Sequence, residues 1–135
     1  AKGKLTSVIE EMSIINPRIK VVTDVPFMEK KYYYAGCDVF LAPTMAKHAC
    51  MGVSIKEAMG CAKAVIASRS GGIPEAIIDG ENGFLFKENN SNDLANKIDN
   101  WFFQNPKIDK NLIRKVVIEK YNPENQMIIF NKHFS

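Results

Sequence analysis

Residues 38–75 read DVFLAPTMAKHACMGVSIKEAMGCAKAVIASRSGGIPE, and this stretch decides the fold class. The apolar run at 39–42 ends at Pro43 and is typical of a strand buried on both faces, as in a parallel sheet. Gly52 then precedes residues suited to a helix that ends at Gly60. A second apolar strand follows at 64–67. Two strands joined by a helix predict a βαβ unit.

The loops that follow these two strands form the candidate ligand site. In open sheets of parallel strands, ligands bind beyond the carboxyl ends of the strands. Both loops leave from that edge, so the candidate site falls on Thr44–Glu57 and Ser68–Glu75.

Upstream of this unit, the sequence predicts a helix, a strand and a second helix. Apolar residues recur at helical spacing over 5–15, and Asn16-Pro17 stops that helix. The β-branched segment 19–22 predicts a strand. Residues 27–36 predict a helix packed on the sheet, and Tyr32 to Tyr34 are interpreted as part of that packing rather than as base-stacking residues.

Downstream, the pattern predicts a short helical turn, a strand and three helices. Their ranges are 74–78 for the turn, 84–86 for the strand, and about 92–104, 110–117 and 123–130 for the helices. Alternating strands and helices indicate an α/β fold with a Rossmann-like, three-layer parallel sheet. Four strands are fewer than the roughly five or six of a doubly wound domain, so we expect a fragment of a larger enzyme.

Composition and charge exclude several classes of function. The chain has 135 residues, 46% hydrophobic and 24% charged, which fits one globular domain over 1–135. A net charge of +3 gives no reason to expect a nucleic-acid partner. We expect no transmembrane segment and no secretory signal. Three cysteines without a CxxC pair favour a reduced, cytoplasmic setting.

Several motifs along the chain resemble those of retaining glycosyltransferases of family 4, which have the GT-B fold. The similar segments are Cys37 to Thr44, the residues Gly52, Glu57, Ala58, Met59 and 64–68, and then Gly71 to Glu75, Gly80 to Leu85 and Asn92 to Ala95. The resemblance covers roughly residues 5–105. It implies a partial C-terminal half of a GT-B fold, which binds a nucleotide-diphosphate sugar for retaining transfer of a hexose.

The chemistry of the helix after the first loop fits such a donor. A helix N-terminus offers free N–H groups and a partial positive charge, so it can hold a diphosphate. A glutamate one turn later can accept hydrogen bonds from two vicinal hydroxyls. The resemblance implies donor-binding roles for eight residues, namely Gly52, Val53 and Ser54 for sugar and diphosphate, Glu57 for ribose, Val25 and Pro26 for the base, and Gly71 and Gly72 for the neighbouring wall.

The sequence departs from the family at the position of its first glutamate, which is Ala49 here. A methyl group cannot stabilise charge near the anomeric carbon, so no catalytic residue is assigned. Neither Lys47 nor His48 replaces a carboxylate. His48 and Cys50 lack further ligands for a metal, so we expect neither a metal nor a cofactor.

Three functional hypotheses remain open. The first is the donor-binding domain of a glycosyltransferase, inactive alone, with a sugar, lipid or glycan acceptor held by a missing N-terminal domain that could also contact a membrane. The second is a degenerate, non-catalytic homologue that acts as a nucleotide-sugar-binding or regulatory partner, as Ala49 suggests. The third is an unrelated nucleotide-binding α/β module, in which Glu57 is merely a solvated helix carboxylate.

Overall fold

The computed structural model describes residues 6–45 and 52–122, which fall into two compact units, 1–30 and 31–135. The first unit contains the helix α1 (Thr6–Ile15) and the 3-10 turn η1 (Phe27–Glu29). α1 confirms the helix predicted from the apolar spacing, and it ends where expected, at Asn16-Pro17. None of its residues is buried.

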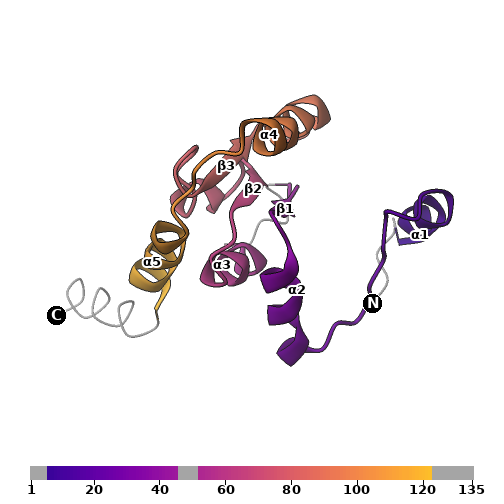
Figure 1. Cartoon of the computed structure of the whole chain (residues 1–135), viewed down its shortest axis with the longest axis horizontal. Helices are drawn as coiled ribbons and strands as arrows, with labels where there is room; N and C mark the ends of the chain where they lie inside the picture. Colours follow the sequence, from indigo (N-terminus) through magenta and orange to yellow (C-terminus); the bar gives the residue numbers. More distant parts are fainter. Residues whose placement is uncertain (1–5, 46–51, 123–135) are drawn as a thin grey trace. The chain divides into compact units, whose positions relative to one another are not determined.

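The second unit is built on a parallel sheet of three described strands, shown in Figure 1. They are β1 (Phe40–Ala42), β2 (Val65–Ser68) and β3 (Gly83–Phe86), in the order β1-β2-β3. Phe40 lies opposite Val65, and Val65 lies opposite Gly83. All four residues of the central strand β2 are buried, as a strand covered on both faces requires.

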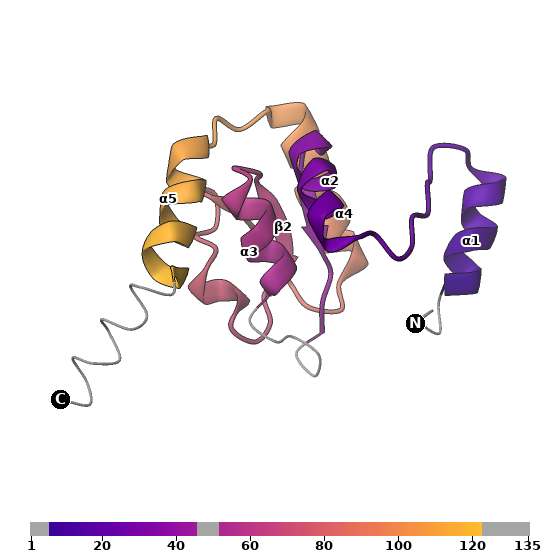
Figure 2. The ribbon, with the colours of Figure 1, turned by 90° about the horizontal axis from the view of Figure 1, so that it is seen from below.

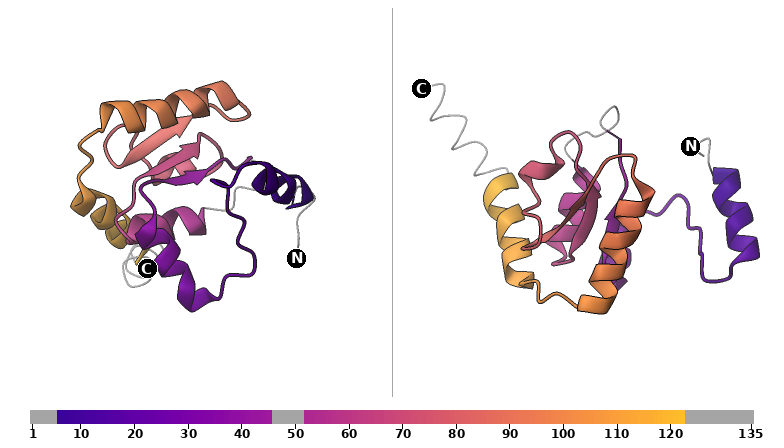
Figure 3. Two further views of the ribbon diagram at one scale, coloured as in Figure 1. Left: turned by 45° about the vertical axis from the view of Figure 1, so that its right-hand side comes forward. Right: turned by 90° about the horizontal axis from the view of Figure 1, so that it is seen from above.

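Helices cover both faces of this sheet (Figures 2 and 3). α4 (Ser91–Gln104) packs on one face, while α3 (Val53–Gly60) and α5 (Lys110–Tyr121) lie on the other. α2 (Lys30–Gly36) leads into β1, and the 3-10 turn η3 (Ile73–Glu75) follows β2. The predicted three-layer, Rossmann-like α/β fold is therefore confirmed.

The core lies between α3, the sheet and α5. Ala58 on α3 and Ala67 on β2 are both fully buried, and their small side chains allow the helix to lie close to the strands. Met59 and Ile113 fill the space around them, at 0% and 1% exposure. The helix ends follow local signals, since Asn90 and Asp109 cap α4 and α5 by accepting the N–H groups of Asp93 and Asn111.

The structure corrects two predictions. Residues 19–22, predicted as a strand, are irregular, because an extended segment becomes a strand only when its backbone pairs with a neighbour, and none of the described strands pairs with it. Tyr34 alone of the three tyrosines is half-buried and packs on the sheet, whereas Tyr32 and Tyr33 are exposed. The helix predicted for 123–130 lies outside the described residues. Across 6–45 and 52–122, none of the helices combines the length and apolar character needed to cross a bilayer.

Gly83 is required by the close approach of β3 to β2. A Cβ at this position would lie 2.6 Å from the backbone oxygen of Val65, so the strands would have to separate. We expect Gly83→Ala to lower the free energy of unfolding by about 1–3 kcal/mol, measured by chemical denaturation. Gly60→Ala is the matched control, because a Cβ there meets nothing within 4 Å. Equal stability of the two variants would contradict this packing.

Asn82 fixes the turn before β3 and is fully buried. Its Oδ1 accepts the N–H of Ile78 at 2.7 Å, and its Nδ2 donates to the carbonyl of Ala76 at 3.1 Å. Asn82→Ala leaves both backbone groups unpaired and should cost about 1–3 kcal/mol in the free energy of unfolding. Asn96→Ala, on the exposed surface of α4, should change it by less than about 0.5 kcal/mol. A loss no larger than that of the control would refute the role of Asn82.

Candidate functional site

The loops at the carboxyl ends of β1 and β2 are joined by hydroxyl groups. Ser68 Oγ donates to the carbonyl of Thr44 and lies 3.0 Å from Ser70 Oγ. Thr44 Oγ1 is 3.2 Å from Ser68 Oγ. Ser68 and Ser70 are both buried, so these hydrogen bonds link the two loops beneath the edge of the sheet where a ligand is expected. The sequence offered a weak signal for this cluster, namely small hydroxyl residues directly after buried strands.

Gly52 sets the start of α3 at this edge. Its backbone is left-handed, with φ 59° and ψ 56°, a conformation that glycine adopts without strain. The first N–H groups of a helix have no acceptor within it, and here they belong to Val53, Ser54 and Ile55. Val53 and Ser54 are exposed, and within 6–45 and 52–122 no side chain caps this helix start. The first turn of α3 therefore presents donors suited to an anion.

Glu57 lies one turn further along the same helix and is half-buried. The hydroxyl of Tyr34, on α2, donates to its Oε2 at 2.8 Å. Burial, followed by this hydrogen bond and the charge of Glu57, raises the pKa of Tyr34 to about 12. Glu57, the residue predicted to bind the ribose, is thus held by a side chain of α2. The sequence did not predict this contact.

The glycine pair after β2 makes a tight turn. Gly71 is left-handed, at φ 52°, and Gly72 directly precedes η3. Arg69 pairs with Asp79, with 3.3 Å between guanidinium and carboxylate. The loop therefore supplies backbone rather than a free cation, and its predicted role as a wall of the donor site stays a prediction.

Val25 and Pro26 belong to the first unit, where they directly precede η1. Val25 is half-buried and Pro26 is exposed. Their predicted contact with the base stays a prediction. Lys47, His48, Ala49 and Cys50 lie outside the described residues.

α5 contacts both α3, through Lys56, and the turn η3, through Glu75. The ammonium of Lys56 lies 3.8 Å from the centre of the Tyr121 ring, and Lys120 Nζ donates to the carbonyl of Glu75 at 2.9 Å. Burial lowers the pKa of Lys56, and the charge of Glu75 opposes that shift. Lys56 is therefore committed to α5, an arrangement that its position in the sequence did not reveal.

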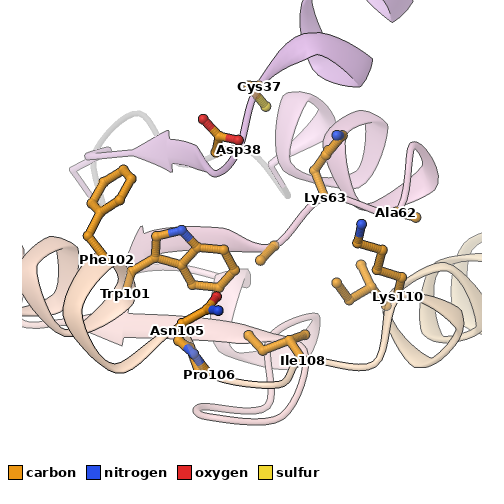
Figure 4. Close-up of a pocket in the computed structure, with 12 residues that line it drawn as sticks. Cys37, Asp38, Ala62, Lys63, Trp101, Phe102, Asn105, Pro106, Ile108 and Lys110 are labelled. Atoms are coloured by element: carbon orange, nitrogen blue, oxygen red, sulfur yellow. The ribbon is translucent and has the colours of Figure 1, made fainter.

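Two hollows lie at opposite edges of the sheet. One, of about 370 Å³, lies at the carboxyl edge and is lined by Thr44 after β1, by the last residues of β2 and β3, Ser68 and Phe86, and by the first turn of α4, but by none of the described residues of α3. The other, of about 380 Å³, lies at the amino ends of the strands, where Asp38, Lys63 and Trp101 face it (Figure 4). We place the candidate site at the carboxyl edge, because α3 begins there.

The fold recurs in solved glycosyltransferase structures. The sucrose-phosphate synthase of Thermosynechococcus elongatus aligns with a TM-score of 0.82 and 24% identity, over 99% of this chain and 34% of that one. HepE of Anabaena in complex with UDP-glucose aligns with a TM-score of 0.67 and 22% identity, over 98% of this chain and 38% of that one. At these identities, the likeness shows a shared fold.

Sequence comparison gives the family. An uncharacterized glycosyltransferase of Methanocaldococcus jannaschii is 37% identical over 98 residues, which are 71% of this chain and only 27% of that protein. The sulfoquinovosyl transferase of Arabidopsis thaliana is 37% identical over 68 residues, or 48% of this chain and 13% of that protein. The family described as Glycosyl transferases group 1 matches residues 2–102. Because this match covers most of the sequence, the chain belongs to the group 1 glycosyltransferases.

Proposed function

We propose that this chain is the donor-binding domain of a glycosyltransferase and binds a nucleotide-diphosphate sugar at the carboxyl edge of its sheet. One observation carries the proposal. α3 begins there at a left-handed Gly52, with exposed residues in its first turn and the carboxylate of Glu57 one turn later. Phosphates and ribose hydroxyls are the two groups of such a donor that these features suit.

The diphosphate and the ribose of the donor would each have a matching group. The N–H groups and partial positive charge of the first turn of α3 would hold the diphosphate, an effect worth about 0.3–1 kcal/mol at an exposed helix end. Glu57 would accept hydrogen bonds from the ribose hydroxyls, and Gly71 and Gly72 would form the neighbouring wall. In this proposal the helix offsets phosphate charge, so neither a metal nor a cofactor takes part.

The transferred group would be a hexose, with its anomeric configuration retained. UDP-glucose is the ligand of the HepE structure that shares this fold, which supports a nucleotide-activated hexose as donor. Departure of the diphosphate leaves positive charge on the sugar and negative charge on the phosphate. Fixed dipoles at the helix end would stabilise the leaving group, which is the main electrostatic contribution available from the described residues.

The acceptor would be held by a further domain. The match spans 27% of the length of the relative from Methanocaldococcus jannaschii, so the relative contains much more chain than this one. A sugar, lipid or glycan acceptor would bind there, and closure of the two domains would exclude water from the donor. The present chain alone would then bind the donor without transferring it.

A second candidate function rests on position 49. This position, where the resemblance predicts a carboxylate, carries a methyl group and lies outside the described residues. A homologue that binds nucleotide sugars without transferring them would fit that substitution. Binding of the donor is common to both candidates, whereas transfer separates them.

Calorimetric titration of the full-length protein with UDP, GDP and ADP tests donor binding. We expect one of the three to bind, and Glu57→Ala to weaken it by about ten- to a hundredfold, because a charged acceptor for the ribose hydroxyls is lost. Glu81→Ala, an exposed carboxylate in the turn before β3, should leave affinity unchanged. Binding that survives Glu57→Ala intact would instead favour an unrelated nucleotide-binding module.

Substitution at position 49 tests catalysis. We expect Ala49→Glu to raise the rate of transfer by the full-length protein at least tenfold, since a carboxylate beside the donor sugar would stabilise charge in the transition state, and single electrostatic contacts contribute about a hundredfold or more in other enzymes. Ala49→Gln, of similar size and without charge, is the control. Equal rates for the unsubstituted protein and both variants would show that position 49 has no catalytic role.

A further inference from the structure

α2 and α3 are linked by one hydrogen bond between side chains 23 residues apart in the sequence. The hydroxyl of Tyr34 lies 2.8 Å from Glu57 Oε2. Its ring is fixed from behind by Phe40, the first residue of β1, at 5.5 Å between ring centroids and an interplanar angle of 71°. The phenol that bonds to Glu57 therefore also packs against the first residue of β1.

The packing of Tyr34 on Phe40 does not require the hydroxyl group of Tyr34. A phenylalanine would make the same edge-to-face contact with Phe40. The two tyrosines before it on α2, Tyr32 and Tyr33, are 67% and 51% exposed. Only the hydroxyl of Tyr34 is directed at the carboxylate that the proposed function assigns to ribose.

The protonation state defines what this hydroxyl can do. A tyrosine hydroxyl is protonated at neutral pH, and the pKa of Tyr34 is raised further, to about 12, so the phenol acts as a donor to Glu57. A carboxylate has two oxygens and about four acceptor positions, so one bond to Oε2 leaves capacity for a diol. A glutamate side chain also has several rotamers, and the fixed phenol restricts them before any ligand arrives.

We propose that Tyr34 is a positioning residue for the donor: it holds Glu57 Oε2 so that the rest of the carboxylate is oriented to accept the vicinal hydroxyls of a ribose. This inference rests on the proposed function and adds to it a residue outside α3. Discrimination between ribose and deoxyribose by this domain then depends on α2. The loss on removing the phenol hydroxyl is confined to ligands that carry the ribose hydroxyls.

A double-mutant cycle on the full-length protein tests this role. The ligands are the tightest binder among UDP, GDP and ADP and its 2′,3′-dideoxy counterpart. The variants are Tyr34→Phe, Glu57→Ala and the two combined, with Tyr33→Phe as the matched control on an exposed phenol of the same helix. Affinities are measured by calorimetry. The dideoxy ligand also reports whether each variant keeps a folded site.

Tyr34→Phe should weaken binding of the ribonucleotide by about three- to tenfold, because the freed Glu57 side chain must then lose its rotamer freedom on binding, and it should leave the dideoxy ligand within about twofold. In the Glu57→Ala background, Tyr34→Phe should not weaken ribonucleotide binding further, because the carboxylate that Tyr34 positions is already absent. Tyr33→Phe should change neither affinity.

Other outcomes overturn the inference in distinguishable ways. Equal losses for both ligands would make Tyr34 a purely structural residue. An unchanged or higher ribonucleotide affinity in Tyr34→Phe would mean that the phenol does not assist the ligand or competes with it. If Glu57→Ala leaves the ratio of ribose to dideoxy affinity unchanged, Glu57 does not bind ribose. If none of the three diphosphates binds the unsubstituted protein, the proposed function itself fails.

Discussion

Two adjacent residues of α3 contact two different helices, and the geometry of the candidate site depends on them. Successive residues of a helix point about 100° apart, so Lys56 and Glu57 reach different neighbours. Lys56 lies over the ring of Tyr121 on α5, at 3.8 Å, and Glu57 accepts the hydroxyl of Tyr34 on α2, at 2.8 Å. Below them, Ala58 and Met59 are fully buried against the sheet. The helix is therefore fixed on three sides, while its first turn remains exposed.

This arrangement favours binding by preorganisation. A ligand that meets a mobile carboxylate must restrict its rotamers on binding, and that restriction weakens affinity. Here the carboxylate is already engaged before a ligand arrives, and the start of the helix is set by a left-handed glycine whose conformation a residue with a Cβ would strain. The hydroxyl cluster of Thr44, Ser68 and Ser70 adds a rigid floor between the two strand ends. Rigidity of the site thus comes from contacts outside the groups proposed to touch the donor.

The sequence predicted most of the second unit because its signals are local. Buried strands, the glycine at each end of α3 and the caps Asn90 and Asp109 each act within a few residues. The strand predicted at 19–22 was wrong, because β-branched composition cannot supply a pairing partner. The contacts from Tyr34 to Glu57 and from Lys56 to Tyr121 were missed for a related reason. They join residues distant in sequence, and one of three neighbouring tyrosines cannot be chosen without the packing of α2.

The two hollows show why volume alone does not locate the site. They are almost equal in size, and the one at the amino ends of the strands is lined by Lys63, Trp101 and Asp38, which a small ligand could contact. The directions of the strands and helices distinguish the two hollows. All three described strands are parallel, and α3 and α4 both begin at the carboxyl edge, where the first N–H groups of a helix have no acceptor within it. The other hollow contains the cations Lys63 and Lys110 and the first turn of α5, whose N-terminus is capped by Asp109. The exposed first turn of α3 is therefore what favours an anionic donor at the carboxyl edge.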